Sequence, residues 1–331
     1  MTVARLLHAI FFFAVDNIRF CVRSRKTNGV WPTEVDFVYL WVDGADPNHQ
    51  KKKNAFIKKS TASYTIESKA VMKYRWANHN EILHSLRSVS LYCPWVHKIW
   101  IITDAQRFDI TALPPAIAKK IVFLDHTDIF RDHTLALPSF NSRSIETLIW
   151  RIDGLSEHFV YFNDDMFVLR PTAIGHFFQG SQPILRGSIR RPFGSYPNSL
   201  HQQGMINSKK LLGEDGKTFF RTAHVPYPMV KSDLERLCET YHEEIKKNVS
   251  FRFRTREQFK IVSLLYEDYI AKKQYASLCR KDYSHISEEG CRSFSRKKIV
   301  RLLRRKSSRF LCINDVGSLS RTVPDYQRFL V

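Results

Sequence analysis

The stretch HFVYFNDDMFVLRP, from His158 to Pro171, places an amide and two carboxylates in the middle of an apolar run. The apolar residues before Asn163 predict a buried β-strand over residues 158–162 that leaves the core at this point. The adjacent carboxylates Asp164 and Asp165 suit a hard divalent cation, because such cations prefer oxygen ligands. The alternative interpretation is an Asx turn with solvated carboxylates.

Three other apolar segments also end at an aspartate: Val35–Val42 at Asp43, Val96–Thr103 at Asp104, and Ile121–Leu124 at Asp125. Residues 81–91 and 142–155 repeat apolar side chains with the period of a helix. Alternating strands and helices predict an α/β fold with a Rossmann-like, mixed or parallel sheet flanked by helices. Ligands of such sheets bind beyond the carboxyl ends of the strands, so these aspartates are expected to line a crevice.

The pattern becomes irregular after Pro171. Residues 186–196 are rich in Arg, Pro and Gly and predict a loop, whereas residues 232–243 and 256–271 predict helices. The C-terminal half is therefore expected to be helical. Without an internal repeat or a low-complexity linker, we expect one catalytic domain over residues 31–331, preceded by a segment over residues 1–30.

The N-terminal segment is amphipathic and basic. Its apolar part, Leu6–Val15, is too short to span a membrane, which takes about 20 apolar residues. Basic residues follow it, so this segment is expected either to lie on an anionic membrane surface or to pack on the core of the domain. The six cysteines lack zinc-type spacing and are interpreted as reduced thiols, which fits a cytoplasmic protein.

The net charge is strongly positive: 52 Lys and Arg against 32 Asp and Glu give +20 in a chain of 331 residues. Such a charge favours an anionic partner, whether nucleic acid, a membrane surface or a phosphate-bearing substrate. Residues 292–309 carry nine basic residues and no acidic one. This run is either a solvated helix face or a site for nucleic acid or anionic lipid. Because no zinc-finger or RNA-recognition signature accompanies it, we expect no nucleic-acid partner.

Three further positions are candidates for chemistry. His224, in RTAHVPYPM, is a candidate general base in a loop that its prolines stiffen; the alternative is a structural histidine. Arg254, in SFRFRTREQF, is expected on the polar face of a short strand, either as a phosphate-binding group or as a solvated basic edge. Asn314-Asp315 in LCINDVGS repeats the apolar-Asn-Asp pattern and could add polar groups to the same crevice.

Taken together, these segments resemble the Stealth family of sugar-1-phosphate transferases, which includes bacterial capsular and exopolysaccharide phosphotransferases and the catalytic core of the animal N-acetylglucosamine-1-phosphotransferase. The resemblance rests on VDFVYLWVDGADP, on NEILHSLRSVSLYCPWVHKIWIITDAQ, on FNSRSIETLIWRIDGLSEHFVYFNDDMFV, and on FLCIND. AHVPYPMVKSDLE and FRFRTREQF also resemble family segments. The recognisable blocks are residues 35–47, 75–130, 140–170, 222–260 and 310–315.

The resemblance implies a glycosyltransferase-A-like core, a nucleotide-sugar donor, usually a UDP-sugar, and Mg²⁺ or Mn²⁺. It implies transfer of sugar-1-phosphate to a hydroxyl of a polysaccharide or lipid-linked oligosaccharide, in capsule or exopolysaccharide synthesis. By position, His224 would be the base, Arg254 and Asp165 would be catalytic, and Asp164 and Asp165 would hold the metal. The substrate contacts expected are Trp41, Asp43, Gly44, Arg75, Arg87, Asp104, Asn163, Arg190 and Asn314.

Two other functions stay open at this point. A metal-dependent glycosyltransferase would use a similar carboxylate site and release the nucleoside diphosphate. A basic module that binds nucleic acid or lipid would use residues 292–309. The expected location is the cytoplasm, either free or at the inner face of a bacterial plasma membrane.

Overall fold

The computed structural model describes residues 30–60, 78–191, 199–279, 282–305 and 307–330, without the side chains of residues 58–60. The predicted N-terminal segment and Arg75 lie outside the described residues. Among the helices that are described, none is both long enough and apolar enough to cross a membrane.

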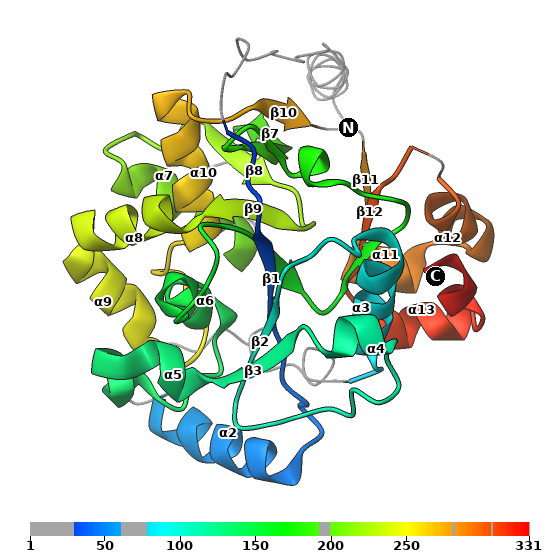
Figure 1. Ribbon diagram of the computed structural model, residues 1–331. Coiled ribbons are helices and arrows are strands. Elements are labelled where there is room, and N and C mark those ends of the chain that lie inside the picture. Colours follow the sequence, from blue (N-terminus) through cyan, green and yellow to red (C-terminus); the bar gives the residue numbers. More distant parts are fainter. Residues whose placement is uncertain (1–29, 61–77, 192–198, 280–281, 306, 331) are drawn as a thin grey trace, which may run out of the picture.

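A five-stranded sheet forms the centre of the fold (Figure 1). Its order is β3-β2-β1-β4-β9; the first four strands are parallel to their neighbours and β9 is antiparallel to β4. The strands are β1 (Val35–Leu40), β2 (Ile99–Thr103), β3 (Ile121–Asp125), β4 (His158–Asn163) and β9 (Tyr227–Val230). This confirms the predicted α/β fold with a mixed sheet, and the first four strands are those predicted from the sequence.

Helices cover both faces of this sheet, which Figure 1 shows nearly edge-on. On one side lie α3 (Glu81–Tyr92) and α4 (Pro115–Ala118), and on the other α5 (His126–Phe130), α6 (Ser142–Glu146), α8 (Lys231–Thr240) and α9 (His242–Ser250). α2 (Pro47–Ser60) lies at the β3 edge. The chain runs from β1 outward to β3 and then returns to β4 on the other side of β1. In open α/β sheets such a reversal is where a ligand is expected to bind, at the carboxyl ends of β1 and β4.

β1, β2 and β4 are largely buried on both faces, as continuous apolar runs predict, whereas the edge strand β3 is half-buried. Phe162 of β4 packs against Phe37 and Tyr39 of β1, with ring centroids 4.8 and 5.0 Å apart. All three side chains are completely buried. Each large apolar side chain buried in this way stabilises the fold by about 1.5–3 kcal/mol.

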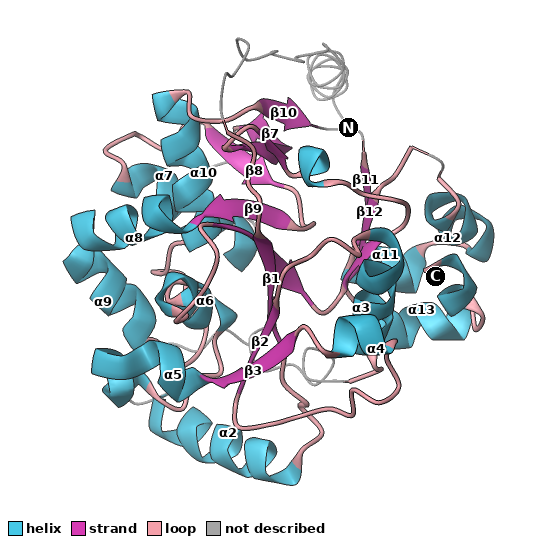
Figure 2. Cartoon of the chain, in the orientation of Figure 1, coloured by secondary structure: helices cyan, strands magenta, loops and turns pink. Residues whose placement is uncertain are grey.

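Two smaller sheets flank the central one (Figure 2). One contains β11 (Tyr283–Ile286), β12 (Phe310–Ile313) and β5 (Met166–Val168), and packs with α11 (Glu288–Ser293), α12 (Arg296–Leu303) and α13 (Val316–Thr322). The other contains β6 (Phe178–Gln179), β7 (Gln182–Arg190), β8 (Phe219–Thr222) and β10 (Ser277–Cys279). α7 (Leu200–Leu211) and α10 (Ile261–Lys272) lie beside β8. The C-terminal half therefore carries the predicted helices together with strands that the sequence did not predict.

The single helix predicted over residues 142–155 is wrong. α6 ends at Glu146, and a 3₁₀ turn over Ile149–Arg151 follows it. The Oγ1 of Thr147 donates to the carbonyl of Arg143 at 2.7 Å, and the Oγ of Ser144 donates to the carbonyl of Phe251 at 2.8 Å. Such side-chain bonds compete with the helical pattern, and tertiary contacts decide the outcome.

Two other local predictions are also wrong. The expected loop over residues 186–196 begins as a strand, because β7 extends to Arg190, and residues 192–196 of this prediction lie outside the described residues. Gly187 has φ +155°, and a Cβ there would lie 2.3 Å from the carbonyl oxygen of Arg221, so only glycine permits this pairing with β8. Conversely, Arg254 lies in an irregular segment and not in a strand, although Phe251 and Phe253 are buried beside it as expected.

Asp36 connects the amino-terminal end of β1 to its neighbours. Its completely buried carboxylate accepts hydrogen bonds from His97 Nδ1 (2.9 Å), Lys98 N (3.0 Å), Trp100 Nε1 (2.8 Å) and Ser156 N (2.9 Å). One side chain thus satisfies donors from β2 and from the turn before β4.

We expect Asp36→Asn to lower the free energy of unfolding by about 2–4 kcal/mol, because the amide presents N–H groups to buried donors. Urea denaturation followed by circular dichroism measures this. Asp153→Asn is the control, since Asp153 is 95% exposed, and it should change stability by no more than about 0.5 kcal/mol. Equal losses in both variants would contradict the assignment.

Candidate active site

The Asp164-Asp165 turn lies where two antiparallel strand pairs meet. β4 pairs with β9 through Tyr161 and Tyr227, and β5 pairs with β12 through Met166 and Cys312. Because both partners run antiparallel, the residues just before Tyr227 and just after Cys312 flank the turn. This geometry brings His224 and Asn314 to Asp165 although they are far away in the sequence.

Asp165 is the centre of these contacts. Asn314 Nδ2 donates to Asp165 Oδ2 at 3.1 Å, and His224 Nε2 lies 3.6 Å from the same oxygen. The backbone N–H of Ile313 donates to the Asp165 carbonyl at 3.0 Å. Asn314 in turn contacts His285 of β11. His224 and Asn314 are therefore held near the Asn163-Asp164-Asp165 turn by backbone pairing as well as by side-chain contacts.

His224 is a partly exposed imidazole between polar neighbours, with 20% of its side chain accessible. Its Nδ1 lies 3.1 Å from the hydroxyl of Tyr227, and its Nε2 lies 3.4 Å from Asn163 Nδ2. When Nδ1–H donates to Tyr227, Nε2 faces Asn163 and Asp165, where the neutral ring presents a lone pair and the protonated ring presents an N–H to the Asp165 carboxylate. In the neutral form Nε2 can accept a proton from a substrate.

Asn163 is positioned by buried side chains behind it. The hydroxyl of Tyr161 lies 2.5 Å from Asn163 Oδ1 and 3.1 Å from Glu146 Oε1. A phenol has one proton to donate, so these two acceptors share it. The amide of Asn163 is thereby oriented with its N–H₂ group toward His224.

The two carboxylates of the turn differ in their electrostatics. Burial raises the pKa of Asp164 well above its ordinary value, and the negative charges of Asp165 and Glu81 raise it further. Burial acts on Asp165 in the same direction, but His224 and the hydrogen bonds to this carboxylate outweigh it and lower its pKa. Asp165 is therefore the ionised partner, and Asp164 lies next to uncompensated negative charge.

Asp165, together with His224 and Cys312 but without Asp164, forms a group that could hold a metal ion. Ligand atoms of Asp165, His224 and Cys312 lie within 4.8 Å of one another, and Asp165 Oδ1 is buried without a hydrogen-bond partner. A buried carboxylate oxygen without a donor is costly unless another group satisfies it. Carboxylates favour Mg²⁺ or Mn²⁺, whereas the imidazole and thiol also suit softer ions.

Two cationic side chains, Lys260 and Arg254, lie around His201, which neighbours His224. The rings of His201 and His224 are 6.4 Å apart, and Lys260 Nζ lies 3.4 Å from His201 Nδ1. Arg254 donates to Ser142 Oγ at 2.5 Å, and its positive charge acts on both His201 and Lys260. The predicted residues Arg254 and His224 thus both lie near His201.

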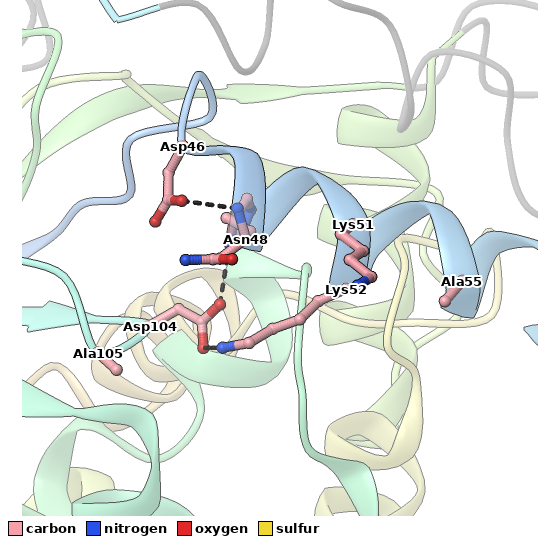
Figure 3. Close-up of a pocket in the computed structure, with 8 residues that line it drawn as sticks. Asp46, Asn48, Lys51, Lys52, Ala55, Asp104 and Ala105 are labelled. Atoms are coloured by element: carbon pink, nitrogen blue, oxygen red, sulfur yellow. Dashed lines mark hydrogen bonds and ion pairs between the residues drawn. The ribbon is translucent and has the colours of Figure 1, made fainter.

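A pocket of about 550 Å³ lies at the carboxyl end of β2 (Figure 3). His49 and Lys52 of α2 contact Asp104 at 2.9 and 3.1 Å, and the hydrogen bond from His49, followed by that from Lys52, lowers the pKa of Asp104 to about 2. β1 separates β2 from β4, so two strand spacings, about 10 Å, separate Asp104 from Asn163 along the edge of the sheet.

The other predicted substrate residues differ in position. Trp41 is 5% exposed and packs edge-on against Phe108, so its ring belongs to the core. Asp43 accepts from the backbone of Ala45, and the carbonyl of Gly44 accepts from Gln50, both in the loop after β1. Arg87 donates to the carbonyl of Ala112, on the α4 side of the sheet. Arg190 lies at the end of β7, in a neighbouring sheet.

Sequence reasoning missed several residues of this site: Tyr161, Tyr227, His285 and Cys312 around Asp165, and Glu146, His201 and Lys260 around Arg254. Tyr227 lies three residues from His224, and Cys312 lies two residues from Asn314. Their closeness in the sequence to these predicted residues could therefore have indicated them. His201 and Lys260 had none, because their pairing depends on how α7 meets α10.

Comparison with protein families gives two matches along the chain. Stealth protein CR1, conserved region 1, matches residues 33–61, and Stealth protein CR2, conserved region 2, matches residues 75–184. Among solved structures, the galactosyltransferase LgtC in complex with donor and acceptor sugar analogues aligns with a TM-score of 0.42 and 11% identity, over 90% of this chain and 96% of that chain.

Curated relatives align over most of the chain. An exopolysaccharide phosphotransferase of Streptomyces coelicolor is 32% identical over 308 residues, which is 89% of this chain and 49% of the relative. A capsular polysaccharide phosphotransferase of Haemophilus influenzae is 29% identical over 300 residues, 87% of this chain and 79% of the relative. The capsular polysaccharide phosphotransferase LcbA of Neisseria meningitidis is 30% identical over 250 residues, which is 71% of this chain and 64% of the relative.

The chain spans 49%, 47% and 31% of the length of three exopolysaccharide phosphotransferases from Streptomyces coelicolor that it matches. Both conserved regions occur in the expected order, and the Asn163-Asp164-Asp165 turn lies inside the second one. The chain therefore belongs to the Stealth protein family.

Proposed function

We propose that this protein transfers sugar-1-phosphate from a nucleotide-sugar, a UDP-hexose or UDP-N-acetylhexosamine, to an acceptor hydroxyl and releases the nucleoside monophosphate. The observation that carries the proposal is the Asp164-Asp165 turn with His224 Nε2 3.6 Å from Asp165. The names of its curated relatives, exopolysaccharide and capsular polysaccharide phosphotransferases, support it.

Within this proposal the acceptor oxygen attacks the phosphorus that carries the sugar. A phosphorus–oxygen bond to the acceptor forms, and the bond to the nucleoside monophosphate breaks. His224 Nε2 takes the acceptor proton, and Arg254 stabilises the phosphoryl oxygens. Such reactions depend mainly on positioning and charge neutralisation.

Asp164 and Asp165 are the proposed ligands of Mg²⁺ or Mn²⁺. The unpartnered Oδ1 of Asp165 and the raised pKa of Asp164 support this choice, because a bound cation would satisfy both. When bound, the cation would neutralise negative charge on the phosphoryl oxygens.

The proposed donor position runs along the carboxyl edge of the sheet, from the pocket beside Asp104 to the Asp164-Asp165 turn. Lys51 and Lys52 line this pocket and suit the negative charge of a nucleotide. Asp43, Gly44, Asn163 and Asn314 are proposed donor contacts on this edge, and Trp41 would support their loop from the core.

The proposed acceptor is a polysaccharide or lipid-linked oligosaccharide at the inner face of a bacterial plasma membrane. The net charge of +20 supports an anionic surface as partner. α12 supports it further: Ile299 and Leu303 are buried, whereas Lys297, Lys298 and Arg301 are exposed. No nucleic-acid partner is proposed.

The first experiment is to identify the nucleotide released from a panel of UDP-sugars with Mg²⁺ and a capsular oligosaccharide. UMP, with a phosphodiester ³¹P signal in the product, is the expected result. UDP would instead identify a conventional glycosyltransferase, in which the bond between the sugar carbon and oxygen breaks.

We expect His224→Gln to lower the transfer rate by about 10²–10⁴-fold, since it removes the base, while affinity for the UDP-sugar stays unchanged. Single-turnover assays and calorimetric titration measure the two quantities. His158→Gln, at the opposite end of β4, should behave like the wild type. Normal turnover by His224→Gln would exclude the base assignment.

We expect Asp164→Asn to stabilise the metal-free protein. The pKa of Asp164 is raised in the folded state, so folding loses stability as the pH rises from about 4, where the unfolded carboxyl ionises, through the folded pKa. Asparagine carries no such penalty, and its advantage should therefore grow with pH.

Thermal unfolding in EDTA between ~pH 4.5 and ~pH 7.5 measures this difference. Mg²⁺ or Mn²⁺ should raise the Tm of the wild type and have little effect on Asp164→Asn. A variant less stable than the wild type throughout, with an unchanged response to cations, would show that Asp164 is a structural residue.

A further inference from the structure

Lys260 is a buried lysine that contacts His201, a neighbour of the proposed catalytic histidine His224. It directly precedes α10, is 7% exposed, and lies 3.4 Å from Nδ1 of His201, the second residue of α7. His201 in turn lies beside His224, with ring centroids 6.4 Å apart. The pair therefore connects the packing of α7 on α10 to the candidate active site.

Gly204 of α7 makes room for this arrangement. A Cβ at this position would lie 3.0 Å from Cγ of Lys260 and 3.1 Å from Cζ of Arg143. Both distances are tighter than ordinary van der Waals contacts. A residue with a side chain at this position would thus require Lys260 and Arg143 to shift by a few tenths of an ångström.

Charged side chains of both signs surround Lys260. Arg143 and Arg254 both act on Lys260, and Glu146 is the carboxylate that acts on it in the opposite direction. In the part of the chain that the structure describes, Lys260 forms no ion pair, and His201 is its hydrogen-bond partner. Arg143 donates to the backbone carbonyls of Thr255 and Leu200, which carry no net charge.

Burial of this kind is costly for an ammonium group. Burial, followed by the charges of Arg143 and Arg254, lowers the pKa of Lys260 to about 7. The pKa of His201 is lowered well below its ordinary value, first by Lys260 and then by burial. An anion between these groups would reverse both effects, because it favours the protonated lysine.

We propose that Lys260 and His201, bordered by Arg254, form an anion subsite beside His224 that binds a tetrahedral oxyanion, the phosphoryl group of a substrate. Lysine supplies the charge, and the neutral imidazole supplies one N–H donor. The phosphoryl group comes either from the diphosphate of the donor or from a phosphate on an acidic acceptor. The role of this subsite in catalysis rests on the proposed phosphotransfer. Anion binding itself can be measured without catalytic turnover.

The test uses sulfate as the probe, because it stays a dianion across the relevant pH range. Calorimetric titration at ~pH 6.5, where Lys260 is protonated, compares the wild type with Lys260→Met and His201→Gln. We expect Lys260→Met to weaken sulfate binding by about 10–100-fold, the effect of losing a charge-assisted hydrogen bond. Lys272→Met is the matched control, since Lys272 is 43% exposed and pairs with Asp268 at the other end of α10.

A charge-preserving variant guards against effects on folding. Lys260→Arg should still bind sulfate, and its affinity should change little between ~pH 6 and ~pH 9, whereas the affinity of the wild type should fall above about pH 7 as Lys260 loses its proton. His201 on α7, Arg143 and Glu146 on α6, Arg254 before α10, and His224 before β9 all face this region. These groups are present both in the wild type and in Lys260→Arg. A difference between the two proteins in the pH dependence of sulfate affinity is therefore due to residue 260.

A titration with UDP separates the two sources of the phosphoryl group. If Lys260→Met weakens UDP and sulfate binding equally, the subsite holds the donor diphosphate. If UDP affinity is unchanged while sulfate binding falls, the subsite holds an acceptor phosphate. Sulfate that fails to bind the wild type, or that binds Lys260→Met equally well, would overturn the proposal. In the separate assay of the released nucleotide, UDP in place of UMP would contradict the proposed phosphotransfer. It would leave the result of the sulfate titration unchanged.

Discussion

The antiparallel pairing on either side of the Asp164-Asp165 turn is the constraint on which the site depends. β4 is buried in the central sheet and ends at Asn163, and β9 returns antiparallel to it. β5 continues the chain into a second sheet and is matched by β12. Backbone hydrogen bonds determine both registers, so His224 and Asn314 are held by rigid elements, although each belongs to a loop. A register shift of one residue would turn every paired side chain to the opposite face.

Burial has opposite effects on the two charged groups of this site. It raises the pKa of Asp164 and lowers that of Lys260, in both cases toward the neutral form. Glu81 and Asp165 add negative charge on one side of His224, whereas Arg143 and Arg254 add positive charge around His201. A fold selected for stability alone would avoid such like-charge groups. The proposed cation and the proposed anion would each compensate one of these groups of like charge.

The fold could be predicted where burial is uniform. β1, β2 and β4 read as short apolar runs because both of their faces are covered, and Glu81–Leu91 reads as a helix because one face is apolar. The edge strand β3 is only half-buried, but its sequence is apolar as well. The prediction failed where tertiary contacts replace local pattern. α6 ends before the predicted helix does, where Thr147 and Ser144 donate hydrogen bonds from their side chains to backbone carbonyls. At Gly187 the composition indicated a loop, but this glycine allows β7 to approach Arg221 of β8 closely. Trp41, expected to contact the substrate, packs edge-on against Phe108 in the core, and its contact with a substrate stays a prediction.

The sequence by itself determined that two carboxylates follow a buried strand, that several strands end at aspartate, and that the chain is strongly basic. These are local properties, since hydropathy and strand length depend on neighbouring residues. Only the tertiary structure decided that His224, Asn314 and Cys312 surround Asp165, and that His201 meets Lys260 at Gly204. These contacts join residues tens of positions apart, and the free energy that brings them together comes from strand pairing and helix packing, which no short segment encodes.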